Sequence, residues 1–309
     1  MPLSLSYRPT SLEEFFGNEA IKESLKSILA REDRPKTILL SGPSGCGKTT
    51  LARIIAKMVN CNDMDLAQYN ISDMRGIDTA REIIASCQFE PLYGEVRVIV
   101  LNECHRATVD WMNAMLEILE EPPKGVYFIL CTTEPEKLLK TIKTRSTTYT
   151  VSTLRKHEMI SLIQWVTQSE GVQLSEKVKN AILFSAEGCA RKALVILDQI
   201  IDIKEEEKQL EAINENTPDE TTIIELCRKI MAKEPGPARW KELSIMLKGI
   251  EQEPESIRRA ILGYLSSVLI NGSHDNGKRV AQLISEFSNN YYDCGKAGLI
   301  SSVYMSTLI

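Results

Sequence analysis

The chain has 309 residues, enough for two or three domains, and 43% of them are hydrophobic while 26% are charged. This balance is typical of a soluble globular protein, and the net charge of −5 permits nucleic-acid binding only through a local basic face. Apolar runs such as 98–101 and 127–131 are too short to span a bilayer, and the N-terminus has no basic segment followed by an apolar core, so we expect a cytoplasmic protein with no membrane partner.

Residues 1–152 alternate between strand-like and helix-like segments. Apolar runs typical of strands lie at 37–40, 96–101 and 126–131, and helical patterns lie at 49–59 and 109–119. Proline cannot continue a helix, so the Pro-Pro pair that follows the second helix should end it. Strands that alternate with helices predict a parallel sheet with helices on both faces.

From residue 153 onward the strand signal disappears. Helical patterns cover 155–168, 175–186 and 189–202, with glycines between them. The polar stretch 204–221 is interpreted as a solvated helix end followed by a linker. Residues 222–309 have the pattern of helices throughout.

The eight cysteines form no Cys-x-x-Cys pair, and several of them lie inside apolar stretches. We therefore expect buried, reduced thiols, because a free cysteine in an apolar stretch behaves as a small hydrophobic residue. The three histidines, His105, His157 and His274, have no ligand-like spacing to the cysteines. A structural zinc site is not expected.

A glycine-rich turn between the first predicted strand and helix contains the strongest motif. Residues 42–49 read Gly-Pro-Ser-Gly-Cys-Gly-Lys-Thr and fit the P-loop pattern G-x-x-x-x-G-K-[ST]. Glycines let backbone N–H groups face phosphate oxygens, and the following helix adds its positive N-terminus. Lys48 is expected to neutralise the β- and γ-phosphates of ATP, and Thr49 to ligate Mg²⁺. The predicted nucleotide-binding residues are Gly42, Pro43, Ser44, Gly45, Cys46, Gly47, Lys48, Thr49 and Thr50.

A second motif follows the strand-like run 96–101. Asn102 and Glu103 occupy the two positions where a P-loop ATPase carries a magnesium-supporting Asp and a water-polarising Glu. Glu103 fits the second role. Asn102 can assist magnesium only as a neutral ligand through water, so we expect weaker magnesium binding and slower hydrolysis with nucleotide binding largely kept.

Together these motifs resemble the ATPase subunits of DNA sliding-clamp loaders, which belong to the AAA+ class. Residues 113–123, Asn-Ala-Met-Leu-Glu-Ile-Leu-Glu-Glu-Pro-Pro, are similar to the helix after the second motif in bacterial gamma/tau subunits of DNA polymerase III. The resemblance covers residues 7–202. The last hundred residues match only in being helical, as the family's oligomerising collar is.

The resemblance implies roles for residues outside the two motifs. The segment Tyr7-Arg8-Pro9 looks like the one that holds adenine in clamp-loader ATPases. Thr133, in a stretch similar to the sensor 1 strand and loop, would touch the γ-phosphate or the attacking water. Arg145, in Thr-Arg-Ser where the family has Ser-Arg-Cys, would be the arginine finger that reaches a neighbouring subunit's ATP. Arg191 looks like the sensor 2 arginine, which reaches the γ-phosphate of its own subunit.

Two departures from the bacterial pattern affect the interpretation. Bacterial gamma/tau subunits usually carry a four-cysteine zinc module between the two motifs, and here that interval holds only Cys61 and Cys87. This layout is nearer to phage, archaeal and eukaryotic loaders, so we expect a phage-encoded protein. The second departure is Asn102, for which we expect slower hydrolysis.

Contacts with DNA and with the clamp are predicted less directly. Arg75, Arg81 and Arg106 are candidate phosphate contacts, because the helix that begins near Arg75 lines the central DNA channel in the family. Ordinary surface charge is the alternative for each. The apolar cluster 89–93, Phe-Glu-Pro-Leu-Tyr, is interpreted either as a clamp-facing anchor or as core packing.

The expected architecture is an α/β P-loop AAA+ domain with a parallel sheet at 1–152, a small helical lid at 153–203 and an all-helical collar at 218–309. The expected function is ATP-dependent opening of a sliding clamp and its loading onto primer-template DNA during replication. The partners are the clamp, that DNA and other loader subunits in a ring, most simply a pentamer. Two alternatives stay open: an ATP-binding structural subunit impaired in hydrolysis, and another AAA+ DNA motor such as a branch-migration helicase.

Overall fold

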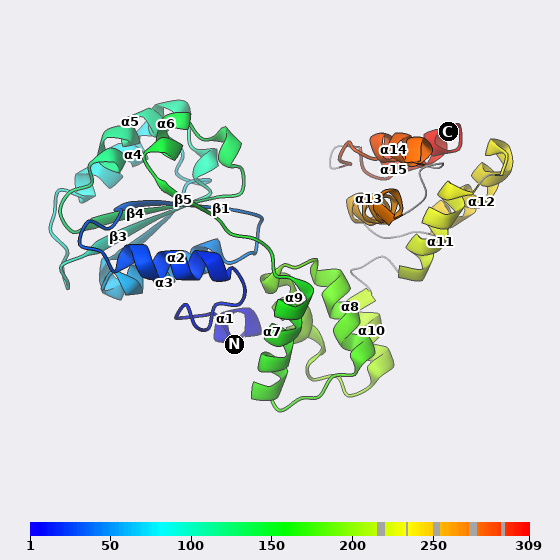
Figure 1. The fold of residues 1–309 in the computed structure, drawn as a ribbon, viewed down its shortest axis with the longest axis horizontal. Helices are drawn as coiled ribbons and strands as arrows, with labels where there is room; N and C mark the ends of the chain where they lie inside the picture. Colours follow the sequence, from blue (N-terminus) through cyan, green and yellow to red (C-terminus); the bar gives the residue numbers. More distant parts are fainter. Residues whose placement is uncertain (215–219, 233, 250–253, 272–276, 292–293) are drawn as a thin grey trace. The chain divides into compact units, whose positions relative to one another are not determined.

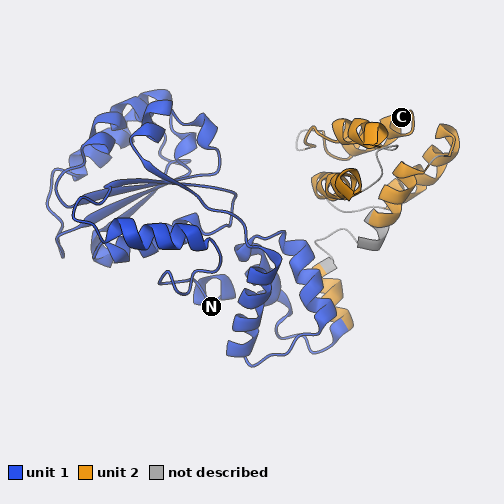
Figure 2. Cartoon of the chain, in the orientation of Figure 1, with its two compact units in different colours: residues 1–206 blue, residues 207–309 orange. Residues whose placement is uncertain are grey.

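The computed structural model divides the chain into two compact units, residues 1–206 and 207–309, which are described separately here (Figure 2). The structure describes residues 1–214, 220–232, 234–249, 254–271, 277–291 and 294–309. No described helix combines the length and the apolar character that crossing a membrane would require.

A five-stranded parallel sheet forms the centre of the first unit, with the strand order β2-β3-β4-β1-β5. The strands are β1 (Thr37–Ser41), β2 (Leu66–Asn70), β3 (Arg97–Asn102), β4 (Val126–Thr132) and β5 (Thr147–Thr150). Parallel strands point the same way, so the segments that follow β1, β3 and β4 meet at one edge of the sheet. This edge is where ligands bind in open α/β sheets.

Helices cover both faces of this sheet (Figure 1). The covering helices are α2 (Glu19–Leu29), α3 (Lys48–Met58), α4 (Ile77–Ser86), α5 (Val109–Glu120) and α6 (Lys140–Thr144). Successive strand residues alternate between the two cores. Ile38 and Leu40 pack with α2 and α3, whereas Leu39 packs with α4 and α5. Because both faces are buried, the central strands read as continuous apolar runs.

The three predicted central strands and both predicted helices of this domain are confirmed to within one or two residues. The sequence reasoning missed β2 and β5, which lie at the two edges of the sheet. Both are partly exposed and rich in polar residues, with the sequences Leu-Ala-Gln-Tyr-Asn and Thr-Thr-Tyr-Thr. An edge strand with one open face lacks the apolar run that marks a buried strand.

Three helices complete the first unit: α7 (Lys156–Ser169), α8 (Glu176–Ala186) and α9 (Ala190–Ile200). They agree with the predicted helices, and Ser175 caps α8 by accepting a hydrogen bond from the N–H of Val178. The short N-terminal helix α1 (Leu3–Ser6) contacts α9, where the N–H of Leu3 donates to Asp198 at 3.1 Å. The N-terminal segment is therefore tied to the helical part of this unit.

The described part of the second unit is helical, as expected. Its helices are α10 (Glu206–Asn214), which begins at the boundary between the units, α11 (Glu220–Met231), α12 (Gly236–Gly249), α13 (Pro254–Asn271), α14 (Gly277–Glu286) and α15 (Gly295–Ser306). The helix end predicted within 204–221 is α10, and the predicted linker and the collar boundary at 218 lie outside the described residues. A division of the first unit at residue 152 stays a prediction.

A buried carboxylate fastens α13 to the segment after α14. The Glu255 side chain accepts hydrogen bonds from the Arg258 guanidinium at 2.6 and 2.9 Å and from the N–H of Tyr291 at 2.9 Å. These donors stabilise the charged form and lower the pKa of Glu255 to about 2, with Arg258 as the largest cause. The second unit thus has its own polar anchor beside an apolar core that includes Leu226, Ile257 and Phe287.

All eight cysteines are free thiols. Five are buried, Cys61 and Cys189 are half-buried, and Cys294 is exposed, so the expectation of buried thiols holds for five of the eight. Burial raises the pKa of Cys131 to about 12 and also that of Cys46, which keeps both thiols protonated at neutral pH.

Candidate nucleotide-binding site

The P-loop connects β1 to α3 in a conformation that glycine makes possible. Gly42, Gly45 and Gly47 have φ values of 146°, 74° and 99°. A Cβ atom on Gly42 would lie 2.1 Å from the carbonyl oxygen of Val151. A side chain would therefore push the loop away from the backbone behind it. The loop ends at Gly47, which caps the N-terminus of α3.

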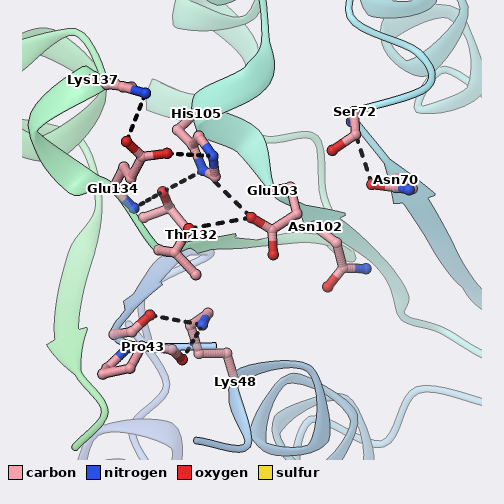
Figure 3. A network of polar contacts seen from close by, with 12 residues as sticks. Pro43, Lys48, Asn70, Ser72, Asn102, Glu103, His105, Thr132, Glu134 and Lys137 are labelled. Carbon is pink, nitrogen blue, oxygen red and sulfur yellow. Dashed lines mark hydrogen bonds and ion pairs between the residues drawn. The ribbon is translucent and has the colours of Figure 1, made fainter. Parts of the chain in front are cut away.

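The Lys48 side chain is held in place by backbone carbonyl groups of this loop. Its side chain donates to the carbonyl oxygens of Gly42 and Pro43 at 2.8 and 2.7 Å, and the residue is only 7% exposed (Figure 3). A buried ammonium group is costly unless it is paired. The phosphate oxygens of ATP would give it full charge compensation, which the two carbonyl groups cannot. The loop therefore fits an anionic phosphate ligand.

Thr49 and Asn102 meet at the position expected for magnesium. The Thr49 hydroxyl donates to the Asn102 amide oxygen at 2.8 Å, which joins the start of α3 to the end of β3. Both groups offer oxygen atoms, the ligand type that Mg²⁺ prefers. Neither oxygen carries a full negative charge, so the pair fits magnesium in ligand type but supplies no neutralising charge.

Glu103 lies at the turn after β3 with φ 52° and ψ 41°, a left-handed conformation that is uncommon for a side chain of this size. Thr133, directly after β4, donates its hydroxyl to Glu103 Oε2 at 3.4 Å. The predicted water-polarising residue and the predicted sensor 1 residue are thus neighbours. Glu103 also faces the ring of His105, whose Nδ1 lies 3.5 Å from Glu103 Oε2.

The N-terminal segment forms part of the wall of a pocket beside the P-loop. It has a cavity volume of about 190 Å³ and brings Tyr7, Arg8 and Pro9 together with Thr50 and Arg191. The Arg8 guanidinium donates to the Thr50 hydroxyl at 3.2 Å. The sequence stretches 7–9, 45–50 and 190–191, which are distant along the chain, therefore line one cavity with an apolar wall to which Phe15 and Phe16 contribute.

Two aromatic residues that line this pocket, Tyr7 and Phe16, pack against Trp165. Tyr7 packs edge-on against Trp165 of α7 with ring centroids 5.1 Å apart, and Phe16 lies 5.8 Å from the same indole ring. The Tyr7 hydroxyl donates to Glu170 at 2.6 Å, and this hydrogen bond raises the pKa of Tyr7. The sequence analysis did not identify Trp165, because a lone tryptophan on a helix carries no motif.

Two arginines that line the pocket, Arg8 and Arg191, repel each other, and the nearby Arg53 adds a third positive charge. Burial lowers the pKa of Arg8, and the positive charges of Arg53 and Arg191 lower it further. The same mutual repulsion would be relieved by an anion, so the cluster suits a polyphosphate. Arg53, which also donates to Gln68 at 3.0 Å, was not predicted from the sequence, where it is one arginine among several on a helix.

The predicted arginine finger lies away from these residues. Arg145, at the end of α6, forms an ion pair with Glu120 at 2.7 Å and donates to the carbonyl oxygen of Thr141 at 3.4 Å. Among the interactions of the described residues, none joins Arg145 to the P-loop of its own chain. A role at a neighbouring subunit's nucleotide stays a prediction.

The candidate DNA contacts are also outside the nucleotide site. Arg75, Arg81 and Arg106 are exposed, and Arg81 is paired with Asp78 on the same helix at 3.1 Å. Ordinary surface charge therefore remains the alternative for each of the three.

The segment 89–93 is not packed in a core. Phe89, Leu92 and Tyr93 are 70%, 79% and 63% exposed, which rules out the core-packing alternative for them. The loop is nevertheless fixed, because Asp65 accepts the N–H groups of Leu92 and Tyr93 at 2.7 and 2.9 Å. Arg97 adds hydrogen bonds to the carbonyl oxygens of Ser86, Phe89 and Glu90.

Comparisons with known proteins show which families this chain resembles. A family model described as DNA polymerase III, delta subunit, matches residues 65–155, and one described as Rad17 P-loop domain matches residues 17–91. The DNA polymerase III subunit gamma/tau of Mycobacterium bovis is 32% identical over 224 residues, which are 65% of this chain and 39% of that protein. The replication factor C small subunit of Natronomonas pharaonis is 33% identical over 191 residues, or 61% of this chain and 58% of that protein.

The chain is a relative of the clamp-loader AAA+ ATPases. It spans less than two thirds of the length of these relatives. The RuvB Holliday junction branch migration motor of Thermotoga maritima superimposes with a TM-score of 0.58 at 20% identity, covering 77% of this chain and 85% of that one. That likeness shows the AAA+ fold alone.

Proposed function

We propose that this chain is an ATPase subunit of a sliding-clamp loader, which opens a DNA polymerase clamp and loads it onto primer-template DNA. One observation carries the proposal. Lys48, the Thr49–Asn102 pair and the Glu103–Thr133 pair converge at the carboxyl edge of the sheet, in a chain 32% identical over 224 residues to a gamma/tau subunit.

Each residue of the site would have a separate role in phosphoryl transfer to water. Lys48 would turn its N–H donors from the two P-loop carbonyls to phosphate oxygens, and the P-loop N–H groups would surround them. Magnesium, when held by Thr49 and, through water, by Asn102, would neutralise charge on the β- and γ-phosphates. Glu103 would accept the proton of the attacking water, which Thr133 helps to position.

Two arginines would stabilise the charge that develops at the γ-phosphate. Arg191 lines the pocket of its own chain and is suited to act within the subunit. Arg145 is suited to act on a neighbouring subunit's ATP, because it is anchored to Glu120 away from its own P-loop. Hydrolysis would then depend on a ring of subunits, which we propose to be pentameric.

Two sets of exposed side chains are candidates for contacts with the clamp and with DNA. Phe89, Leu92 and Tyr93 form an exposed apolar group on a loop fixed by hydrogen bonds, which suits an anchor for the clamp. Arg75, Arg81 and Arg106 would contact DNA phosphates, a mode independent of sequence that suits action at any primer end. A phage origin stays a prediction.

Asn102 favours one alternative function, an ATP-binding subunit with impaired hydrolysis. Its neutral amide supplies the geometry of a magnesium-supporting residue without the charge. The branch-migration alternative is supported only by the shared AAA+ fold.

The deciding experiment is ATP turnover by this chain with its partner subunits, with and without sliding clamp and primed DNA. The Asn102→Asp variant is measured in parallel and should turn over faster, by about tenfold or more at low magnesium, because a carboxylate replaces the amide. Strong stimulation by clamp plus primed DNA supports the loader. Turnover by the Asn102→Asp form alone supports the impaired subunit. No response to clamp or DNA in either form contradicts the clamp-loader proposal.

A further inference from the structure

A buried imidazole separates two carboxylates at the edge of the nucleotide site. The His105 side chain is 1% exposed; its Nδ1 lies 3.5 Å from Glu103 Oε2 and its Nε2 lies 3.1 Å from Glu134 Oε1 (Figure 3). Glu103 comes from the turn after β3, and Glu134 comes from the loop after β4. A buried polar ring is costly unless its nitrogen atoms have partners, and here both nitrogens face acceptors.

Thr132 provides a partner for the Nδ1 atom of this ring. Its hydroxyl oxygen, fully buried, lies 3.1 Å from His105 Nδ1 and accepts the N–H of Glu134 at 3.0 Å. The hydroxyl can donate its own hydrogen to Nδ1 while it accepts this N–H, and we infer from the carboxylate that faces Nε2 that Nδ1 is the acceptor. A neutral imidazole has one N–H, so that hydrogen would be on Nε2 and face Glu134.

The contact between Nε2 and Glu134 is electrostatic rather than an aligned hydrogen bond. The negative charge of Glu134 still favours a hydrogen on the facing nitrogen. Lys137 lies 2.6 Å from Glu134 and, by a hydrogen bond, lowers the pKa of that carboxyl group. Glu134 is thus kept as a carboxylate, which is the form that attracts Nε2–H.

The tautomer of His105 has a direct consequence for Glu103. When Nδ1 bears no hydrogen, the hydrogen bond that the Glu103 carboxylate receives from the described residues is the long 3.4 Å one from Thr133, and the carboxylate stays able to accept a proton from water. When Nδ1 bears the hydrogen, the ring can donate a charge-assisted hydrogen bond to Glu103. That bond would draw the carboxylate away from the water and weaken it as a base.

We propose that His105 is a positioning residue for Glu103 and that Glu134 sets its tautomer. The inference rests on the proposed function, because it assigns His105 and Glu134 to the rate of ATP hydrolysis. Neither residue touches the P-loop in the interactions of the described residues, so both are expected to affect the rate of turnover and to leave ATP affinity unchanged.

The tautomer is measured directly by ¹⁵N NMR of the imidazole rings in the intact chain without nucleotide. The chain has three histidines, and the His105 signals are assigned by their loss in His105→Phe. We expect the Nε2–H tautomer in the natural chain and a shift toward Nδ1–H in Glu134→Gln. The matched control is Glu136→Gln, an exposed carboxylate on the same short turn, which should change nothing. An Nδ1–H tautomer in the natural chain, or no response to Glu134→Gln, would overturn the proposal.

The kinetic test asks whether Glu134 acts through the ring. Glu134→Gln should lower kcat at least about fivefold with the Kd for ATP unchanged within about twofold. The same substitution in a His105→Phe background should change kcat by less than about twofold. An equal loss in both backgrounds contradicts the proposal. If His105→Phe does not fold, Glu134→Gln alone remains decisive, since an unchanged kcat or a weakened Kd would contradict the proposal.

Failure of the proposed function is separable from failure of this inference. If the natural chain does not hydrolyse ATP, the rates are compared in the Asn102→Asp form. Absence of turnover in both forms overturns the proposed function and, with it, the kinetic part of the inference. The NMR measurement needs no ATP and reports on the Glu134–His105 interaction independently.

Discussion

Gly42 has the most constrained backbone position of the candidate site. Its φ of 146° is accessible mainly to glycine, and the space that a Cβ would need is taken by the carbonyl oxygen of Val151 at 2.1 Å. The obstacle is backbone of the segment after β5, so it cannot rotate out of the way as a side chain would. The first glycine of the P-loop therefore sets how closely the loop approaches the sheet.

Replacement of Gly42 by Ala should move the loop and weaken both folding and nucleotide binding. We expect a loss of stability on the order of 2 kcal/mol or more and at least about a tenfold loss of ATP affinity. Thermal unfolding and titration with a fluorescent ATP analogue measure the two effects.

The control is Gly94→Ala, whose Cβ would meet its nearest atom at an ordinary 3.8 Å. It should leave ATP affinity unchanged. Equal behaviour of the two variants would mean that the close contact with Val151 does not constrain the loop.

At the scale of elements, parallel strand direction assembles the site. The ends of β1, β3 and β4 are separated by dozens of residues in the sequence, yet their carboxyl ends carry the P-loop, Glu103 and Thr133 to one edge. The loop 89–93 after α4 is instead held where strands begin. Its anchors are Asp65, directly before β2, and Arg97, the first residue of β3.

Phe89→Ser should weaken clamp binding without weakening the fold. The side chain is 70% exposed, so its removal costs little packing, whereas loss of an apolar anchor at an interface typically costs about 1–2 kcal/mol or more. We expect at least about a tenfold rise in the Kd for the clamp in the presence of ATP, measured by titration of labelled clamp.

Phe184→Ser tests whether any exposed phenylalanine has this effect. Phe184, 42% exposed on α8, lies on a helix with no predicted clamp contact, and its replacement should leave clamp affinity unchanged. Clamp affinity that is the same in Phe89→Ser as in the natural chain would remove segment 89–93 from the clamp surface.

At the scale of the whole molecule, one chain brings most of the candidate catalytic residues together, whereas Arg145 lies away from them. The ion pair with Glu120 fixes this arginine on the surface near the end of α6. Because no interaction among the described residues joins Arg145 to the P-loop of its own chain, we expect it to act on a nucleotide of another subunit. The activity is therefore expected to depend on assembly.

Arg145→Ala should leave ATP binding by the isolated chain unchanged and lower turnover of the assembled ring by at least about 100-fold, since arginine fingers contribute large factors to phosphoryl transfer. Turnover of assemblies mixed from Arg145→Ala and Glu103→Gln chains should exceed that of either variant alone, because some interfaces regain both groups.

Lys140→Ala, an exposed cation at the start of the same helix, is the control and should turn over normally. An assembled Arg145→Ala ring that hydrolyses ATP at the normal rate would contradict the assignment.

The sequence by itself determined the P-loop, the buried strands at 37–40, 96–101 and 126–131, and the helices that follow them. These features depend on local rules: glycine at positive φ, apolar runs for strands buried on both faces, and helical periodicity. The edge strands β2 and β5 were missed because a partly exposed strand of mixed polarity has no such local mark.

Only the tertiary structure decided which side chains share a site. His105 and Glu134 are 29 positions apart and carry no motif, and they meet because β3 and β4 are neighbouring parallel strands. Arg53 of α3 comes near Arg8, and Trp165 of α7 packs against Tyr7, only through the packing of these helices in the fold. The exposure of segment 89–93 also required the structure, since an apolar pattern of that length is equally compatible with a core and with a surface anchor.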